Sequence, residues 1–348
     1  MSDNTGRRKF IQLGLGAVGL GIVGSLSGCS AIQDSASGSG EQTDTTDGTP
    51  TDGDQGYQLG AVAGFSDWVY EPDEFDADAG GLTVDVIGYS AVVSNRERLR
   101  DDTYQDIIGD EWSQLGVGPE DVDIEIQLPD GKVITGSFET DAVKEQLQTA
   151  SSDSDIDTFE SERTYDDTYE IFAPTPQTHP RVAYAVEDQT IVRGNEVENI
   201  ANDADAVSAD EVVTGIIDIG TGNDAGLIDS GNSAFATLLD GLDTADMLSV
   251  ELLANEVGSE DGEAVDVPAG QFEGVVAEAV SVEINGDTTV FNFGVVYEDE
   301  DAVDEGDIND WVEANDTGDD LFADLDDISV DSAGRTATVT ATASTNAL

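Results

Sequence analysis

Segments in which apolar and polar residues alternate, each closed by a tight turn, constrain the fold of this chain most. Residues 122–128 alternate Val, Ile and Leu with Asp, Glu and Gln, which is the period of a strand with one buried face. Asp130 and Gly131 then turn the chain, and residues 132–138 return. The range 121–138 is therefore predicted to form a β-hairpin.

The same hairpin pattern recurs further along the chain. Residues 280–297 alternate in the same way and turn at Asn285 and Gly286, a favoured hairpin turn. Residues 181–194 form a third candidate hairpin that turns near Asp188. A last strand is predicted over 335–344, where Ala and Val alternate with Thr.

Helical patterns lie between these hairpins, the first of them capped by Thr140. Helices are predicted over 140–150, 195–202, 208–219, 233–242 and 304–314. We therefore expect an α+β fold of two related halves, 57–205 and 206–348, each an antiparallel, hairpin-rich sheet with helices packed on one face.

The charge of the chain is strongly one-sided, with 76 acidic residues against 12 basic ones and a formal net charge of −64. This excess excludes a nucleic-acid binder, which needs a basic patch for the phosphates. The acids are spread over every predicted element, and their longest unbroken run is Glu298–Asp301. We call these dispersed acidic residues the acidic coat. Their charges repel one another in dilute buffer, and salt screens that repulsion, so we expect a halophilic protein. Cation storage is the rival interpretation.

The first 28 residues have the pattern of an export signal and are set apart from the fold. Arg7 and Arg8 precede an apolar run that is diluted by glycines, which resembles a twin-arginine translocation signal. Gly14, Gly16 and Gly19 match the spacing of a dinucleotide-binding loop, but no strand precedes them. We expect the export machinery as a partner and no nucleotide site in this segment.

A cleavage motif ends the signal. Leu26, Ser27 and Gly28 precede Cys29, the single cysteine of the chain, and resemble the lipobox of a lipoprotein. Cys29 is therefore predicted to carry lipid and to hold the protein on the outer face of the cell membrane. Residues 29–56 are rich in Ser, Thr, Gly and Asp and are predicted to be a disordered tether.

Residues 135–143, taken with the ranges 165–172, 183–193 and 197–202, carry a resemblance. The chain resembles secreted lipoproteins of halophilic archaea, and more faintly a bacterial family of exported proteins of unknown function. The resemblance covers about half of the chain and rests on packing patterns. It implies export and the fold, and it brings no activity, cofactor or ligand.

No catalytic constellation can be assembled from the sequence. His179 is the sole histidine and lies between prolines, without a Gly-x-Ser-x-Gly motif to support a triad. One histidine and a cysteine assigned to lipid leave no ligand set for zinc, copper or iron, so we expect no cofactor and no metal. The acidic clusters at 73–78, 153–157 and Glu298–Asp301 lack the spacing of a calcium loop, although a calcium site stays open as an alternative.

Two further groups have a structural and a functional interpretation. The arginines of 96–100 are expected to pair with neighbouring acids on a helix, the alternative being a site for an anionic ligand. Trp68, Tyr70 and Phe75 are expected to close the end of a core, the alternative being an apolar ligand site.

The leading hypothesis from the sequence is a lipid-anchored, non-enzymatic surface protein of a halophile that acts as an envelope or ligand-binding component. Two alternatives stay open. A solute-binding lipoprotein of a transporter would show parallel βαβ units, whereas the patterns here are hairpins. A secreted hydrolase that uses only carboxylates would need one indispensable acid among the many of the coat.

Overall fold

The computed structural model describes residues 59–75, 81–109, 111–149, 159–174, 181–197, 206–257, 259–260, 263–264, 272–303, 305–314 and 325–347. The predicted signal with Arg7 and Arg8, the cleavage motif with Cys29, the tether and His179 all lie outside these residues. Within the described part of the chain, no helix has both the length and the apolar character needed to cross a bilayer.

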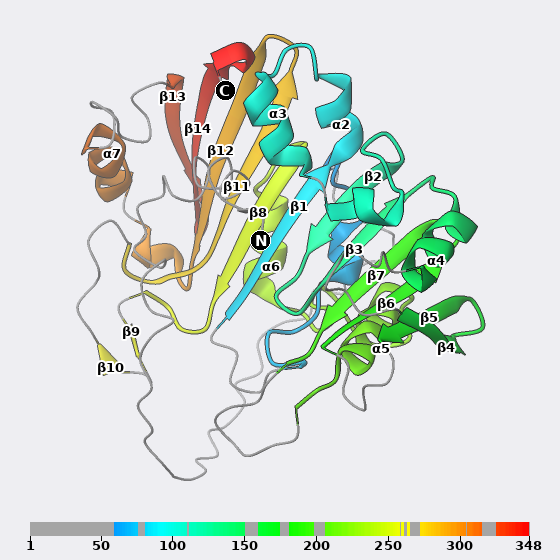
Figure 1. The fold of residues 1–348 in the computed structure, drawn as a ribbon. Helices are drawn as coiled ribbons and strands as arrows, with labels where there is room; N and C mark the ends of the chain where they lie inside the picture. Colours follow the sequence, from blue (N-terminus) through cyan, green and yellow to red (C-terminus); the bar gives the residue numbers. More distant parts are fainter. Residues whose placement is uncertain are drawn as a thin grey trace.

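The centre of the fold is a single twelve-stranded sheet in which neighbouring strands pair antiparallel, in the order β13-β14-β12-β11-β8-β1-β2-β3-β7-β6-β5-β4 (Figure 1). Its strands are β1 Gly81–Gly88, β2 Val122–Gln127, β3 Gly131–Gly136, β4 Phe159–Tyr165, β5 Tyr169–Pro174, β6 Val182–Glu187, β7 Thr190–Asn195, β8 Met247–Leu253, β11 Val275–Asn285, β12 Thr288–Tyr297, β13 Asp326–Ala333 and β14 Thr336–Ser344. A separate pair, β9 Ser259–Glu260 and β10 Glu263–Ala264, lies in a connection.

Helices cover both faces of this sheet (Figure 1). They are the 3-10 helix η2 Phe65–Trp68, α2 Tyr89–Ser94, α3 Asp101–Ile108, the 3-10 helix η3 Glu111–Leu115, α4 Thr140–Gln148, α5 Ala209–Gly220, α6 Ser233–Asp240 and α7 Glu305–Ala314, with short 3-10 turns η4 Glu300–Ala302 and η5 Thr345–Ala347. We call the face that carries α2, α3, α4 and α7 the front face, and the face that carries η2, α5 and α6 the back face.

The predicted hairpins are confirmed because their turns are determined by local chemistry. In the β11–β12 hairpin, Asn285 pairs with Thr288, and Gly286 adopts a positive φ of 67°, which glycine reaches without steric cost. In the β2–β3 hairpin, Gln127 pairs with Lys132, so the turn falls at residues 129–130, one position earlier than expected.

The prediction of a separate sheet for each half is wrong. β1 and β8 pair side by side over the length of β1, with Val84 opposite Val250, and join the strands of both parts into one sheet. The strands of 81–195 lie on one side of this junction and those of 247–344 on the other. A sheet that ended at β1 would expose a long apolar edge, and the pairing with β8 removes that edge.

The prediction that helices pack on one face of the sheet only is also wrong, because the central strands are apolar on both sides. In β3, Val133 belongs to the back cluster and its neighbour Ile134 to the front cluster, and both are completely buried. Successive side chains of a strand point to opposite faces, so two buried neighbours require a helix layer on each side. The class, an α+β fold with a mostly antiparallel sheet, is as expected.

The helix predicted from residue 195 is corrected in its described part. Asn195 ends β7 and Val197 makes an isolated bridge with Val207, while 198–202 lies outside the described residues. By contrast, the predicted helix near 208 is confirmed as α5. Its capping box pairs Ser208 with Glu211, which satisfies the free N–H groups of the first turn.

The first turn of α4 differs from expectation in one contact. Thr140 is the first helical residue and not the cap, a position that belongs to Glu139. The Thr140 hydroxyl donates instead to the backbone oxygen of Asp188 in the β6–β7 turn, at 3.2 Å. Val143 and Leu147 are buried as the helical period predicts.

Candidate functional site

Three carboxyl groups lie on the front face where β1, β8 and β11 run side by side. Glu278 on β11 stands directly opposite Glu251 on β8, in register. Asp85 on β1 is opposite Ser249, whose Oγ donates a hydrogen bond of 2.6 Å to Asp85 Oδ1. Like charges directly opposite in a sheet are destabilising, so this arrangement needs an explanation.

Glu278 is the most buried of the three, with 8% of its surface exposed. Burial, and secondarily the negative charge of Glu251, raise the pKa of Glu278 to about 8 from an ordinary 4.5. Burial, and secondarily Asp85, also raise the pKa of Glu251. At neutral pH Glu278 is therefore mainly a neutral carboxylic acid beside an ionisable neighbour.

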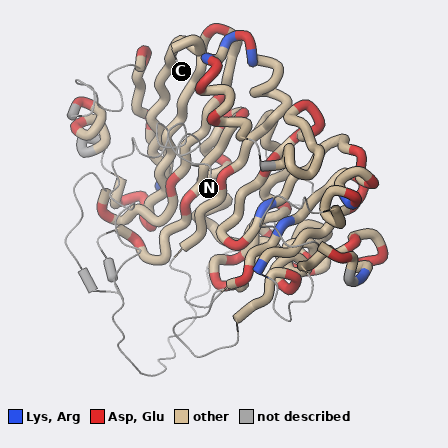
Figure 2. The backbone as a smooth tube through the Cα atoms, in the orientation of Figure 1, with Lys and Arg blue, Asp and Glu red and all other residues tan. Residues whose placement is uncertain are grey.

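The span of chain that forms β8, β11, β12 and α7 contributes no cation to this group. Between Arg193 and Arg335 the chain contains no Lys, Arg or His at all, and this span includes β8, β11, β12 and α7. Figure 2 shows the same asymmetry over the body, where acidic positions far outnumber basic ones. Among the described residues, Glu278 makes no hydrogen bond and no ion pair.

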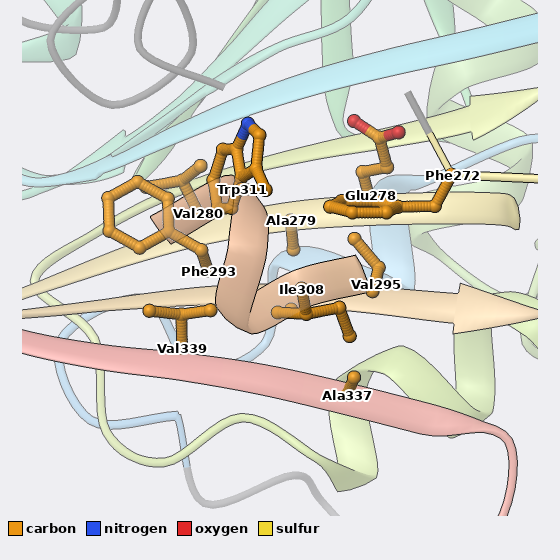
Figure 3. A pocket seen from close by; sticks show the side chains of 11 residues that line it. Phe272, Glu278, Ala279, Val280, Phe293, Val295, Ile308, Trp311, Ala337 and Val339 are labelled. Atoms are coloured by element: carbon orange, nitrogen blue, oxygen red, sulfur yellow. The ribbon is translucent and has the colours of Figure 1, made fainter. Parts of the chain in front are cut away.

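Glu278 borders an apolar pocket between α7 and the front face (Figure 3). The sheet contributes Val280, Phe293 and Val295, and α7 covers them with Ile308 and Trp311. The ring of Phe272 meets the ring of Trp311 edge to face, with centroids 5.7 Å apart. The enclosed volume is about 20 Å³, which admits one group of the size of a water or a methyl group.

A second charged group on the front face serves the core. Glu125 on β2 is 2% exposed and accepts hydrogen bonds from the Tyr89 hydroxyl at 2.8 Å and from Trp112 Nε1 at 2.7 Å. Lys132 Nζ lies 3.9 Å from Glu125 Oε1, so the buried charge is compensated. These contacts tie α2 and η3 to the sheet, which is a structural role.

The arginines of 96–100 pair with acids as expected, although they lie in the connection between α2 and α3 rather than on a helix. Arg96 pairs with Asp101 and stacks over the Tyr104 ring, and Arg100 Nη2 lies 2.5 Å from Asp102 Oδ2. Arg98 Nε is 3.5 Å from Asp287 Oδ1 in the β11–β12 turn. Each arginine is paired, which supports the ion-pair interpretation over an anion site.

The aromatic residues that follow the predicted tether close the back core. Tyr70 and Phe75 are buried and meet edge to face at 4.9 Å, and Trp68 packs against the same cluster. The Tyr70 hydroxyl donates to Asp130 Oδ2 at 3.1 Å, and burial, followed by the charge of Asp130, raises the pKa of Tyr70. The core interpretation of this group is therefore confirmed.

The acidic run Glu298–Asp301 borders an open hollow of about 450 Å³ that also contains Glu256 and Glu273. In the described ranges, however, no three acidic, His or Cys side chains are placed so that they hold a metal ion. Of the cluster at 73–78, Asp73 and Glu74 are described, whereas 76–78 and the cluster at 153–157 lie outside those ranges.

No sequence motif points to the pair Glu251 and Glu278, although β11 carries a local signal. In β11, Glu278 has the same parity as Val280, Val282 and Ile284, all of which belong to the front cluster. An acid on the apolar side of an alternating strand marks a buried charge. Its partner across the ladder depends on the register of β8 and β11, which no local pattern specifies.

Comparisons with known proteins show no family. No family model matches the chain, and no curated protein matches it. Among solved structures, two crystal forms of the bacterial protein TP0453 are similar, with TM-scores of 0.42 and 0.41, 8% identity, and coverage of 83% of this chain and 94% and 93% of theirs. A similarity of this degree supports no conclusion about function.

Proposed function

We propose that this chain is a lipid-anchored, ligand-binding protein on the outer face of a halophile's cell membrane, and that it acts without enzymatic chemistry. The anchoring part rests on Arg7, Arg8 and the Leu26–Cys29 motif. The binding part rests on one observation, the position of Glu278, which is 8% exposed and makes no hydrogen bond or ion pair with the described residues, at the border of an apolar pocket.

The halophilic part of the proposal rests on the distribution of the acids. They lie on strands, helices and connections alike, as Figure 2 shows. At a Debye length of about 3 Å in 1 M salt, repulsion between exposed acids is screened. The same coat would repel anionic lipid headgroups, so the lipid on Cys29 is the proposed attachment to the membrane.

We also propose that the two parts of the chain are related to each other. In sheet order, β1-β2-β3-β7-β6 corresponds to β8-β11-β12-β14-β13, with β1 and β8 adjacent at the centre. In both parts a strand is followed by a hairpin, a helix (α4 or α7) and strands that return beside the hairpin. A homologous chain whose two parts align in sequence over these elements would test this relation, and one that aligns in a different order would refute it.

A hydrolase that uses only carboxylates is a second candidate function, because Glu251 and Glu278 stand opposite each other. A neutral Glu278 beside Glu251 supplies one proton donor and one potential base, the two roles that carboxylate hydrolysis uses. If the protein hydrolyses glycosides, both Glu251→Gln and Glu278→Gln should lose activity by more than 100-fold. A broad glycoside screen in which the unaltered chain is inactive removes this candidate.

Anchoring is tested by replacing Cys29 with Ser and following the protein in membrane and medium fractions. The proposal expects release of the body or an uncleaved precursor, together with a lipid-modified N-terminal Cys29 peptide in the unaltered protein. A mature peptide that continues through Ser27, Gly28 and an unmodified Cys29 refutes anchoring. Replacement of Arg7 and Arg8 by Lys should block export, and normal export of that variant refutes the twin-arginine route.

A further inference from the structure

The turn between β11 and β12 places two groups side by side that can react with each other. Asn285 is the last residue of β11 and pairs with Thr288 of β12, and Gly286 follows it in the turn. This is the single Asn-Gly step in the sequence. An asparagine side chain carries an electrophilic amide carbon, and the backbone nitrogen of the next residue closes a five-membered ring when it attacks that carbon. Glycine in the following position leaves this nitrogen unshielded by a side chain.

The folded structure leaves both reacting groups accessible. Asn285 is exposed, and a Cβ built on Gly286 would have no neighbouring atom within 4 Å, so no other element crowds the turn. Among the described residues, the Asn285 side chain makes no hydrogen bond and the Gly286 N–H donates none. No interaction with the described chain therefore has to break before the ring can close.

Two other asparagines of the described chain are held by their side chains. Asn292 is 7% exposed, its Nδ2 donates to Ser281 Oγ at 3.2 Å, and its Oδ1 accepts from Thr340 Oγ1 at 2.9 Å. Asn232 caps α6, where its Oδ1 accepts from the backbone N–H of Phe235 at 3.0 Å. Each of the two is followed by a residue with a side chain, so neither has the freedom of the asparagine in the turn.

We infer that Asn285 is a site of spontaneous deamidation. The Gly286 nitrogen attacks Cγ of Asn285, the new C–N bond closes a succinimide, and the side-chain nitrogen leaves as ammonia with the proton that Gly286 gave up. Water then opens the ring at one of its two carbonyl carbons. One opening gives aspartate, and the other gives isoaspartate, in which the main chain runs through the former side chain and is one methylene longer. Water is the only co-reactant that these steps need.

The products alter a turn at which three segments meet. Asp287 Oδ1 lies 3.5 Å from Arg98 Nε, and the Asp287 backbone oxygen accepts from the Thr345 N–H at 3.0 Å, so the turn joins the α2–α3 connection and η5. Either product adds a negative charge next to Asp287. Isoaspartate also lengthens the main chain where Asn285 pairs with Thr288, and the end of the ladder then loses its register. Deamidation should therefore loosen this end of the sheet.

Incubation of the full chain at pH 8 in 3 M KCl, followed by peptide mass spectrometry, tests the site. Cleavage after Glu283 and Glu298 releases the peptide 284–298, which contains both Asn285 and Asn292. We expect the mass gain of an amide exchanged for an acid at Asn285, as two separable products of equal mass, and a faster gain at higher pH. The same gain at Asn292 should be at least about tenfold slower, because its two hydrogen bonds must break first.

Asn285→Gln is the matched control, because glutamine keeps the amide but must close a larger and slower ring. During the same incubation the melting temperature of the unaltered chain, measured by circular dichroism, should fall as isoaspartate accumulates, and that of Asn285→Gln should stay constant. An Asn285 that stays unmodified, or that changes at the same rate as Asn292, overturns the site. The comparison with Asn292 is made within the unaltered chain and stands even if the variant does not fold. Equal losses of melting temperature in the two proteins overturn the loosening of the sheet.

Discussion

Replacing Glu278 by glutamine should stabilise the folded protein, and the gain should grow as the pH rises from about 5 to 8. The folded state holds a proton on Glu278 up to a pKa of about 8, whereas the ordinary value for an exposed glutamate is 4.5. Between these values the folded state binds more protons than the unfolded state. The stability that the protonated Glu278 provides is therefore complete below pH 4.5 and is lost as the pH rises through 8.

The magnitude follows from the two pKa values. Each pH unit in this window costs about 1.4 kcal/mol for one proton. Because the unfolded chain ionises residue 278 while the folded chain keeps it protonated, about 3 kcal/mol of stability is lost by pH 7 and about 5 kcal/mol above pH 8. Glutamine has nearly the same shape and never ionises. The difference in unfolding free energy between Glu278→Gln and the unaltered chain should thus rise from near zero at pH 4.5 toward this upper figure.

Urea unfolding at constant 3 M KCl, followed by circular dichroism from pH 5 to 8.5, measures this difference. The acids of the coat titrate in both proteins, so their contribution cancels in the comparison. Glu283→Gln, on the same strand, should retain the pH slope of the unaltered chain. A free-energy difference that is flat with pH, or a Glu278→Gln variant that is less stable at pH 8, would refute the reasoning.

Three further predictions concern the coat, the buried pair and one close contact. With a net charge of −64, the chain should unfold in about 0.05 M salt and recover a cooperative melt in 3 M salt, and equal melting temperatures by circular dichroism would show that the acids are incidental. Glu125→Ala removes the carboxylate that faces the buried charge of Lys132 and should cost about 3 to 5 kcal/mol in urea unfolding, and a loss under 1 kcal/mol would argue against a compensated pair. Gly136→Ala should destabilise the fold by more than about 2 kcal/mol, because the added Cβ would lie 2.1 Å from a backbone oxygen. Gly294→Ala, whose Cβ would have no neighbour nearer than 3.6 Å, should cost less than half as much. Equal costs for the two variants would contradict the steric argument.

The elements that could be predicted are those whose signal is local. The turn at Gly286, the capping box of Ser208 and Glu211 and the alternation in β14 each specify their own structure within a few residues. The helix expected from residue 195 fails for the opposite reason. Val197 has a partner, Val207, ten positions further along, and that bridge outweighs a weak helical pattern.

The candidate site could not be predicted because it is created by pairing between distant strands. Glu251 and Glu278 belong to β8 and β11, and only the register of that ladder places them opposite each other. Asp85 joins them because β1 pairs with β8, and no pattern within β1 indicates that partner. The arginine group behaves differently, because Arg96 and Arg100 find acids within a few residues and pair as predicted.

The pairing of β1 with β8 has a consequence for the order of folding. Asp85 and Ser249, which meet across this ladder, are 164 residues apart in the chain. Contacts of such long separation form slowly, and at about 5 to 20 residues per second the ribosome needs on the order of 10 to 30 s to make the second strand after the first. During that interval β1 is an open edge, and an acidic side chain at Asp85 discourages a neighbouring nascent chain from adding to it.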